Sequence, residues 1–436
     1  MSRPMKSPGL SASIERRNCR RVVIAVSLLA LAALGNAARA QESADEANGL
    51  VVGMGYTGEF RRNTSGGLDV GNAYLDLLDL GASFSTDRLS FASLTTNLSV
   101  MHVGGDDISG DFVGDLHGVS NIEAPDAWHL YEFWSELNFG GRSHTSLRLG
   151  LLDINADFDV PVTSALFVGS PHGIGTEFSQ TGGNGPSVWP VTGLGIRAAG
   201  EWNGNLRWRV GAFEGTPGDD REDRFAVFDL GRGEGSLLIG ELEYSSDRFN
   251  KLSAGVWSYT ADFDRLDAGL AADARTEHGN QGVYALVDVK VADLGAARID
   301  ASLRAGAADA RFNAIDEFVA ATVVARHPFA SRPDDAIGFA VAYGRTGDLY
   351  RQVQAIAGVP SASAETSYEL TYHAPLTAWL ALTPTVQFVD NPGADLSLRD
   401  AWVVGLRVEF TQEKSWPLLA RRDAPATPAV ARTEGQ

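Results

Sequence analysis

Residues 127–154, AWHLYEFWSELNFGGRSHTSLRLGLLDI, have the pattern of two β-strands joined by a tight turn. Apolar and polar residues alternate along both segments, as they do when the two faces of a sheet meet different surroundings. Gly140, Gly141 and Arg142 lie between the segments and suit a turn. The stretch therefore predicts an antiparallel hairpin, and its pattern recurs along most of the chain.

Sixteen segments of about ten residues with this alternation lie between Leu50 and Phe410. The connections between them are alternately short and long, and the longest spans residues 155–190. A soluble sandwich has no reason to place its long connections at every second junction, whereas bacterial outer-membrane barrels have short periplasmic turns and long outward loops. We predict an all-β fold, namely a sixteen-stranded antiparallel transmembrane β-barrel with long extracellular loops.

Residues 1–40 have the pattern of a secretory signal peptide. A segment rich in arginine precedes the apolar run 22–33, which is too short to span a bilayer. Ala38-Arg39-Ala40 fits a cleavage site, so we expect the mature chain to begin at Gln41. Cys19, the single cysteine, leaves with the signal, which removes disulfides, a lipid anchor and cysteine metal sites from consideration.

Removing the signal changes the formal net charge from −19 to about −25, because residues 1–40 carry seven basic residues and one acid. So acidic a protein is a poor partner for nucleic acid. We predict a barrel domain over residues 41–411, in which the loop 155–190 folds toward the lumen. Residues 412–436, rich in Pro, Ala and Thr, are predicted to be a disordered tail.

Alternation assigns the side chains of each strand to the lipid or to the lumen. In 127–140 one set contains two glutamates that cannot reasonably face lipid, which places the whole set, including both tryptophans, in the lumen. That set is Trp128, Glu132, Trp134, Glu136 and Asn138. By the same rule Tyr131 and Phe133 face lipid, and His129 lies on the lipid side near the interface.

Other charged residues fall on the polar face of their strands. A charge on the lipid face near the bilayer midplane costs about 2–4 kcal/mol, so an aqueous interior is the better explanation. The predicted lumen residues outside 127–140 are Arg148, Arg197, Arg207, Arg209, Arg304, Glu369, Gln387 and Arg407. Such a wall suits neutral polyols, whose hydroxyls both donate and accept hydrogen bonds, and aromatic faces can pack on a pyranose ring. A non-selective pore has a similar wall, and the tryptophans can equally be packing residues.

Several stretches resemble the carbohydrate-selective porin family, typified by the bacterial glucose porin. They are WSELNF (134–139), LRLGLLDINADF (147–158), ETSYELTY (365–372), WLALTPTVQFVDNPG (379–393) and VVGLRVEF (403–410). The resemblance runs in order through most of residues 50–411. It implies an outer-membrane barrel of sixteen strands through which mono- or small oligosaccharides and ions diffuse passively.

The resemblance also implies that inward arginines, acids and aromatics near a constriction contact the sugar. The candidates within the matching motif are Trp134, Glu136, Arg148, Asp153, Asn155 and Asp157. The last three have an alternative role, because residues of these types also cap a strand end and shape the following loop. Arg407 and Glu409 can likewise simply pair across the seam of the barrel, and Gln387 can be a strand-end residue.

Two other functions are considered. A pore for other small solutes such as organic anions is the first, although the inward face carries comparable numbers of acids and arginines. An outer-membrane barrel hydrolase is the second, but no G-x-S-x-G elbow or H-E-x-x-H motif occurs, and His172 in the long loop is better explained as a loop contact. We expect no enzyme activity, cofactor or metal. The expected partners are sugars, the lipid bilayer and lipopolysaccharide, and a homotrimer is compatible with the sequence.

Overall fold

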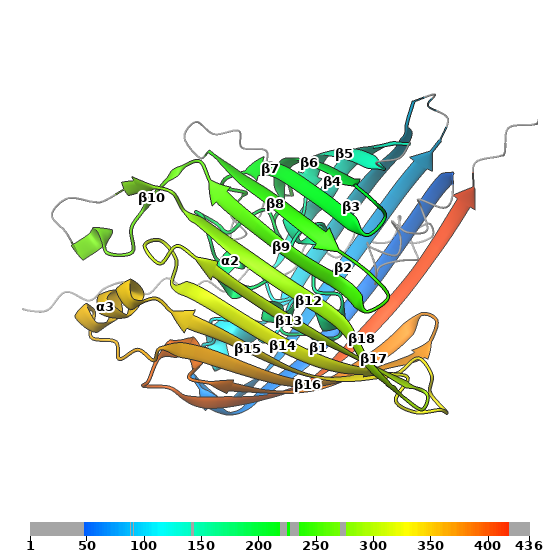
Figure 1. The fold of residues 1–436 in the computed structure, drawn as a ribbon. Helices are drawn as coiled ribbons and strands as arrows, with labels where there is room; N and C mark the ends of the chain where they lie inside the picture. The colour runs from blue at the N-terminus through cyan, green and yellow to red at the C-terminus, as the bar shows by residue number, and fades with distance from the viewer. Residues whose placement is uncertain are drawn as a thin grey trace, which may run out of the picture.

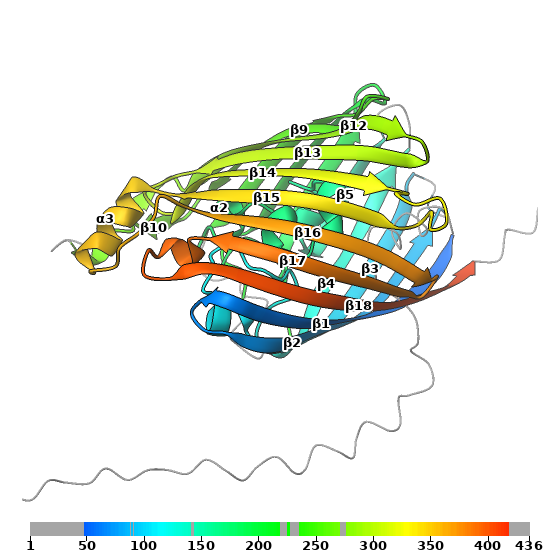
Figure 2. The same ribbon diagram turned by 90° about the horizontal axis from the view of Figure 1, so that it is seen from below.

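The structure is a computed structural model that describes residues 48–87, 89, 91–140, 144–218, 225–226, 235–270 and 276–417. Sixteen of its strands form a closed antiparallel barrel, shown from two sides in Figures 1 and 2. The predicted fold class is confirmed. The expected signal peptide, residues 1–40, lies outside the described residues.

The barrel strands follow one another in chain order around the wall. They are β1 (Gly49–Gly67), β2 (Gly71–Thr86), β3 (Ser93–Gly105), β4 (Ala127–Phe139), β5 (Thr145–Leu152), β6 (Gly193–Glu201), β7 (Leu206–Glu214), β8 (Ser236–Tyr244), β9 (Phe249–Tyr259), β12 (Gln281–Leu294), β13 (Ala297–Ala308), β14 (Ile315–Arg326), β15 (Ala336–Thr346), β16 (Ala364–Thr377), β17 (Leu380–Asp390) and β18 (Arg399–Pro417).

The remaining elements lie in the loops. They are the two-stranded ribbon β10 (Asp262–Asp264) and β11 (Thr276–His278), the helices α2 (Thr176–Ser179) and α3 (Asp348–Ile356), the 3₁₀ turns Ile154–Ala156, Thr163–Leu166, Ser170–His172, Ala268–Leu270 and Pro392–Ala394, and the π turn Ser109–Val113. No helix among the described residues is both long and apolar enough to cross a membrane.

Pairing between the first and last strands closes the barrel. The register runs from Gly49 opposite Pro417 to Gly67 opposite Arg399. β18 therefore continues past residue 411, and residues 412–417 are paired strand rather than part of the predicted tail. Residues 418–436 lie outside the described residues. Because closure leaves no free sheet edge, each of the sixteen barrel strands has a hydrogen-bonded neighbour on both sides.

The two faces of each strand differ as the alternation predicts. Leu149, Val210 and Leu370 are 62 %, 50 % and 49 % exposed on the outer surface. Their neighbours Arg148, Arg209 and Glu369 point inward, where they make the contacts described below. The outer face is thus apolar and suited to acyl chains, whereas the inner face is polar.

One stretch of β4 departs from simple alternation. The register with β3 passes from Ser99 opposite Glu132 to Val100 opposite Leu130, so Tyr131 is an extra residue in a β-bulge. Beyond the bulge the faces exchange. His129 is buried, whereas Trp128 is 43 % exposed. Trp128 therefore faces outward and His129 inward, because an inserted residue reverses parity. Tyr131 itself was predicted to face lipid, but its hydroxyl donates to Asp153 at the start of the loop 153–192. The predictions for these three residues were wrong.

We predict that Leu149→Arg lowers the free energy of unfolding by about 2–4 kcal/mol, since it places a charge near the middle of the lipid face. Denaturant-induced unfolding in lipid vesicles measures this change. Asn138→Arg is the matched control, because Asn138 is a partly exposed residue with inward parity on the adjacent strand. Equal losses in the two variants would contradict the assignment of faces.

Candidate functional site

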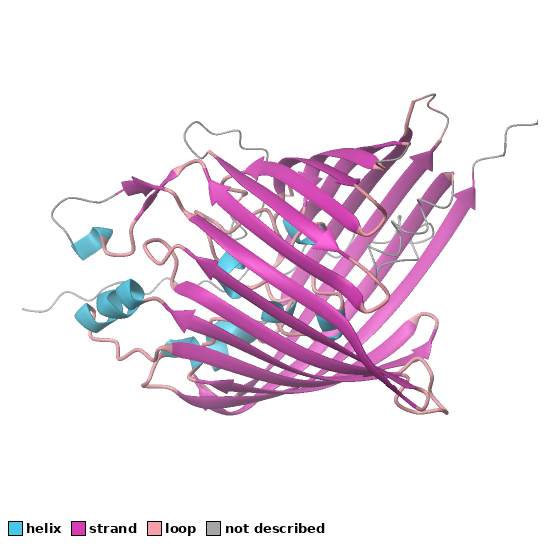
Figure 3. Cartoon of the chain, in the orientation of Figure 1, coloured by secondary structure: helices cyan, strands magenta, loops and turns pink. Residues whose placement is uncertain are grey.

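Two loops enter the barrel and narrow its lumen. The loop 153–192, between β5 and β6, carries α2 and three 3₁₀ turns, and Figure 3 shows short helical segments inside the ring of strands. α2 contacts β13 and β14, and the turn Thr163–Leu166 contacts β13, β14 and β15. The second loop, 106–126, joins β3 to β4 and also reaches the inner wall. The sequence did not predict the inward course of this second loop.

Carboxylates of the wall accept hydrogen bonds from backbone N–H groups of the loop 153–192. The two oxygens of Asp288 accept from the N–H groups of Val162 and Thr163, each at 2.9 Å. Glu369 likewise accepts from two consecutive residues, Val168 at 2.8 Å and Gly169 at 2.9 Å. Hydrogen bonds to an ionised acceptor are stronger than neutral ones, so these carboxylates fix the path of the loop.

The loop 106–126 is held in the same way, by residues of β16, β17 and β18. Glu365 accepts from the N–H groups of Leu116 at 2.8 Å and His117 at 2.9 Å. Gln387 donates to the carbonyl of Val119 at 3.0 Å, and Arg407 donates to the side-chain oxygen of Asn121. Two of the predicted lumen residues, Gln387 and Arg407, are thus loop anchors.

The two loops are also bound to each other. Asn121 N–H donates to the carbonyl of Val168 at 2.7 Å, and Ser170 N–H donates to that of Gly118 at 3.0 Å. The Gln180 amide donates to the carbonyl of Leu116 at 2.6 Å. The loops therefore form one continuous body that spans the lumen, rather than two independent flaps.

Two histidines lie within this body. His117 hydrogen-bonds Thr176 through Nδ1 at 2.7 Å, and its Nε2 lies 4.0 Å from Glu365. His172 Nε2 lies 3.8 Å from Glu369. Burial disfavours the charged imidazolium and lowers the pKa of His117 to about 4, and burial also lowers the pKa of His172. Both rings are therefore neutral at neutral pH, and His172 is a loop contact, as the sequence indicated.

Four predicted residues meet in one ionic cluster. Arg148 donates to Glu136 at 2.7 Å and to Asp157 at 3.1 Å. Arg197 donates to the same two carboxylates at 3.0 and 3.1 Å. The cluster therefore joins β4, β5 and β6 to the start of the loop 153–192, with two cations and two anions in balance.

The other predicted residues of the shared motif shape the loop. The carboxylate of Asp153 accepts a hydrogen bond from the N–H of Asn155 at 2.7 Å and so caps the turn Ile154–Ala156. Asn155 donates to the carbonyl oxygens of Phe158 at 3.2 Å and Asp159 at 3.0 Å. Glu132 is buried, and one of its carboxylate oxygens lies 3.4 Å from Asp153 N. These contacts match the alternative role considered for Asp153 and Asn155.

Trp134 points inward but is covered. Its side chain is only 4 % exposed, and the Arg148 guanidinium lies 4.0 Å from the centre of its ring. Other inward aromatics are covered by the loop 153–192. Phe178 of α2 stacks on Trp257 of β9 with a centroid distance of 5.0 Å and an interplanar angle of 11°. In this conformation these rings bind the loop to the wall.

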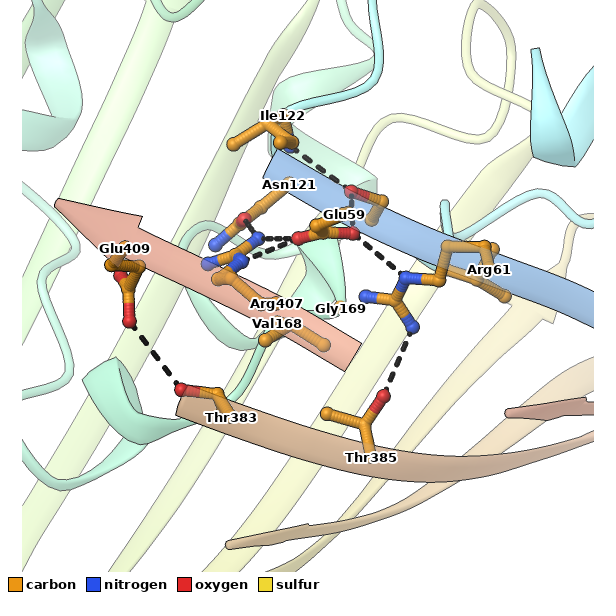
Figure 4. A network of polar contacts seen from close by, with 12 residues as sticks. Glu59, Arg61, Asn121, Ile122, Val168, Gly169, Thr383, Thr385, Arg407 and Glu409 are labelled. Atoms are coloured by element: carbon orange, nitrogen blue, oxygen red, sulfur yellow. Dashed lines mark hydrogen bonds and ion pairs between the residues drawn. The ribbon is translucent and has the colours of Figure 1, made fainter. Parts of the chain in front are cut away.

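The seam of the barrel carries another polar network, shown in Figure 4. Glu59 of β1 accepts from Arg61 at 2.7 Å and also pairs with Arg407 of β18. Arg61 continues the network to Thr385 at 3.2 Å and Gln387 at 3.0 Å. Arg407 thus pairs across the seam, as the sequence suggested, although its partner is Glu59 and not Glu409.

The remaining predicted residues form two further clusters. Arg304 of β13 binds Glu177 at 2.8 Å and also Asp159, both in the loop 153–192. Arg207 and Arg209 of β7 both pair with Glu243 of β8, at 3.4 and 2.7 Å. Apart from Trp128, the predicted wall residues thus face inward, but most are engaged with loops or with one another.

Sequence reasoning missed several anchors. Glu59, Asp288 and Glu365 occupy inward positions of their strands, so their parity was available as a signal. Their role was not readable, because it depends on loop groups far away in the chain. Among the described residues, no set of three or more His, Cys, Asp or Glu side chains is placed to hold a metal ion.

Comparison with known proteins agrees with this architecture. The sequence model of the OprB family of carbohydrate-selective porins matches residues 70–411 of this chain. Porin B of Pseudomonas aeruginosa is 24 % identical over 398 residues, which cover 81 % of this chain and 86 % of that protein.

Solved structures show the same fold. OprB of Pseudomonas putida, in its high-pH structure, superposes with a TM-score of 0.74 at 20 % identity, covering 86 % of this chain and 96 % of that one. OmpF of Salmonella typhi, solved in complex with daunomycin, gives a TM-score of 0.52 at 12 % identity, covering 84 % of this chain and 99 % of that one.

The family match and the fold indicate a channel rather than an enzyme, and they assign it to the outer membrane. The closed barrel, its polar interior and the family model over residues 70–411 lead to one conclusion. The chain belongs to the OprB family of carbohydrate-selective porins and is an outer-membrane carbohydrate porin.

Proposed function

We propose that this porin selects sugars by size and by hydrogen bonding, in the passage left between the joined inner loops and the wall. The supporting observation is the contrast between inward aromatic and polar side chains. Trp134, Trp257, Tyr259 and Tyr284 are each 4 % exposed or less. Polar residues such as Asn121 and Glu409 keep exposed surface.

The accessible polar groups suit neutral hydroxyls. Asn121 is exposed and lies beside Arg407, whose side chain is 11 % exposed. Arg209 is 18 % and Glu409 is 27 % exposed. Guanidinium groups only donate, carboxylates only accept, and an amide does both, so a hydroxyl finds a partner for each of its roles. Since sugars exchange these bonds for bonds to water, passage needs no tight binding.

The buried ionic clusters have a different role in this proposal. Glu136, Arg148, Arg197, Arg304 and Glu369 act through the loop that they hold, and they set the width of the passage. Trp134 acts as a packing residue beneath Arg148. Assembly into a homotrimer, contact with lipopolysaccharide and the lack of hydrolytic activity stay predictions of the sequence.

We expect the refolded protein to form ion-conducting channels in planar bilayers whose current is reduced by glucose or a small oligosaccharide. A sugar in the passage displaces mobile ions, so the block should rise with sugar concentration and saturate. Channels blocked only by organic anions would contradict the sugar proposal. Ester turnover without any conductance would favour the hydrolase alternative.

We expect Glu369→Gln to raise single-channel conductance, increase current noise and weaken sugar block. The change removes charge-assisted hydrogen bonds to two N–H groups of the loop, each contributing about 1.5–3 kcal/mol. Single-channel recording measures all three effects.

Glu409→Gln is the matched control for this experiment. It also removes one inward negative charge, but Glu409 contacts wall residues, Thr383 at 3.4 Å and His373 at 3.8 Å. If both variants change the conductance and its noise alike, Glu369 does not hold the loop, and the effect is one of charge alone.

A further inference from the structure

Five basic side chains form a continuous group on the inner wall, toward the periplasmic ends of four strands. We call them the basic belt, which consists of Arg207 and Arg209 of β7, Lys251 of β9, Arg298 of β13 and Arg326 of β14. Their strands belong to one arc of the barrel, β7-β8-β9-β12-β13-β14.

Shared partners connect the members of the belt. Arg207, Arg209 and Lys251 all pair with Glu243, at 3.4, 2.7 and 3.6 Å. Arg298 donates to the side-chain oxygen of Asn250, next to Lys251, at 3.1 Å. Arg298 and Arg326 share one carboxylate, that of Asp300, at 2.8 and 3.2 Å.

Three arginines of the belt are much more exposed than the carboxylates they pair with, whereas Arg209 is 18 % and Lys251 is 6 % exposed. The side chains of Arg207, Arg298 and Arg326 are 44 %, 40 % and 39 % exposed. Those of Glu243 and Asp300 are 7 % and 3 % exposed. Water and solutes on this part of the wall therefore meet mainly guanidinium groups, and the one partly exposed counterion is Glu201, 23 % exposed beside Arg207.

The belt lies next to the edge of the inner loop. Lys251 Nζ donates to the carbonyl of Val160 at 3.1 Å. Asp288 of β12 is fully buried and lies opposite Lys251 in the strand register. Its carboxylate accepts hydrogen bonds from the N–H groups of Val162 and Thr163 in the loop 153–192. A solute that leaves the loop passage toward the periplasm therefore reaches the belt next.

The acid that faces this arc belongs to a distant strand. β8 lies between β7, which carries Arg207 and Arg209, and β9, which carries Lys251. β18, which carries Glu409, lies half-way round the closed strand order from β8. Glu409 is 27 % exposed. The periplasmic half of the lumen thus has basic groups on one wall and a carboxylate on the other.

We propose that the basic belt is a transient binding surface for anionic solutes, and that the porin therefore passes sugars bearing a carboxylate, such as uronic acids, better than neutral sugars of the same size. This inference rests on the proposed sugar passage and deepens it. A guanidinium pairs with a carboxylate through two parallel N–H donors, and partly exposed arginines can do so without leaving their buried partners. A surface of one sign raises the local concentration of the opposite ion.

The test is the double variant Arg207→Gln/Arg326→Gln. It removes two exposed cations, yet the buried carboxylates keep partners, because Glu243 retains Arg209 and Lys251, and Asp300 retains Arg298. Reversal potentials across a KCl gradient at low ionic strength report the chloride-to-potassium permeability ratio. We expect anion selectivity that falls about twofold for each charge removed, as Coulomb attraction in water at roughly 10 Å gives.

The matched control is Arg62→Gln/Arg345→Gln. It also removes two positive charges, but at the extracellular ends of β1 and β15, where Arg62 bonds Asn72 and Arg345 bonds Glu317. It should leave the permeability ratio unchanged. A cation-selective wild-type channel, or equal shifts in both double variants, would overturn the proposal.

Flux into proteoliposomes separates this inference from the proposed function. The rate of glucuronate entry relative to glucose entry should fall in Arg207→Gln/Arg326→Gln and stay constant in the control. Glucose entry with an unchanged ratio would refute the belt alone. Absence of any sugar entry in the wild type would refute the proposed function itself.

Discussion

Hydrocarbon offers no hydrogen-bond partner to a peptide group, and this constraint shapes every part of the molecule. A sheet in lipid must close, because each unpaired N–H or C=O would cost several kcal/mol. Here the ladder between β1 and β18 provides that closure over its whole length. Once the sheet is closed, the strict alternation of side chains produces two surfaces with opposite solvent requirements. The aqueous interior is therefore a consequence of closure.

The interior of the barrel is not an open channel bounded by the strands alone, because two loops occupy part of it. Loops carry backbone groups that need partners, and the wall supplies carboxylates at Asp288, Glu365 and Glu369 that accept consecutive N–H groups. Burying a carboxylate is costly unless several donors compensate for its lost hydration. The same contacts that satisfy the loop therefore satisfy the wall, and removing either partner leaves the other unsatisfied.

This arrangement divides the polar residues by task. Clusters such as Glu136, Arg148 and Arg197 are buried and define where the loop runs. Side chains such as Asn121, Arg209 and Arg326 keep exposed surface, and these are the groups that we propose meet the solute. Charge alone does not separate the two groups, since both contain arginines and acids. Burial separates them, and burial is decided by where the loops lie.

Alternation in the sequence was enough to predict the barrel, its sixteen strands and the inward direction of Glu136, Arg148, Arg197 and Arg407. These properties are local, because a period of two residues fixes the face of each side chain without reference to the rest of the chain. Where one residue is inserted the rule fails, as Trp128 and His129 show on either side of the bulge at Tyr131. Parity beyond a bulge depends on the register with the neighbouring strand.

The sequence by itself thus determined which residues can touch lipid and which need water, because successive residues of a strand point to opposite faces of the sheet. Only the tertiary structure decided which inward residues hold the loops and which stay exposed inside the barrel. Glu365 and Leu116, or Arg304 and Glu177, meet across more than a hundred residues of chain. No local pattern encodes such a meeting, since it depends on the closed wall bringing distant strands and loops into one confined space.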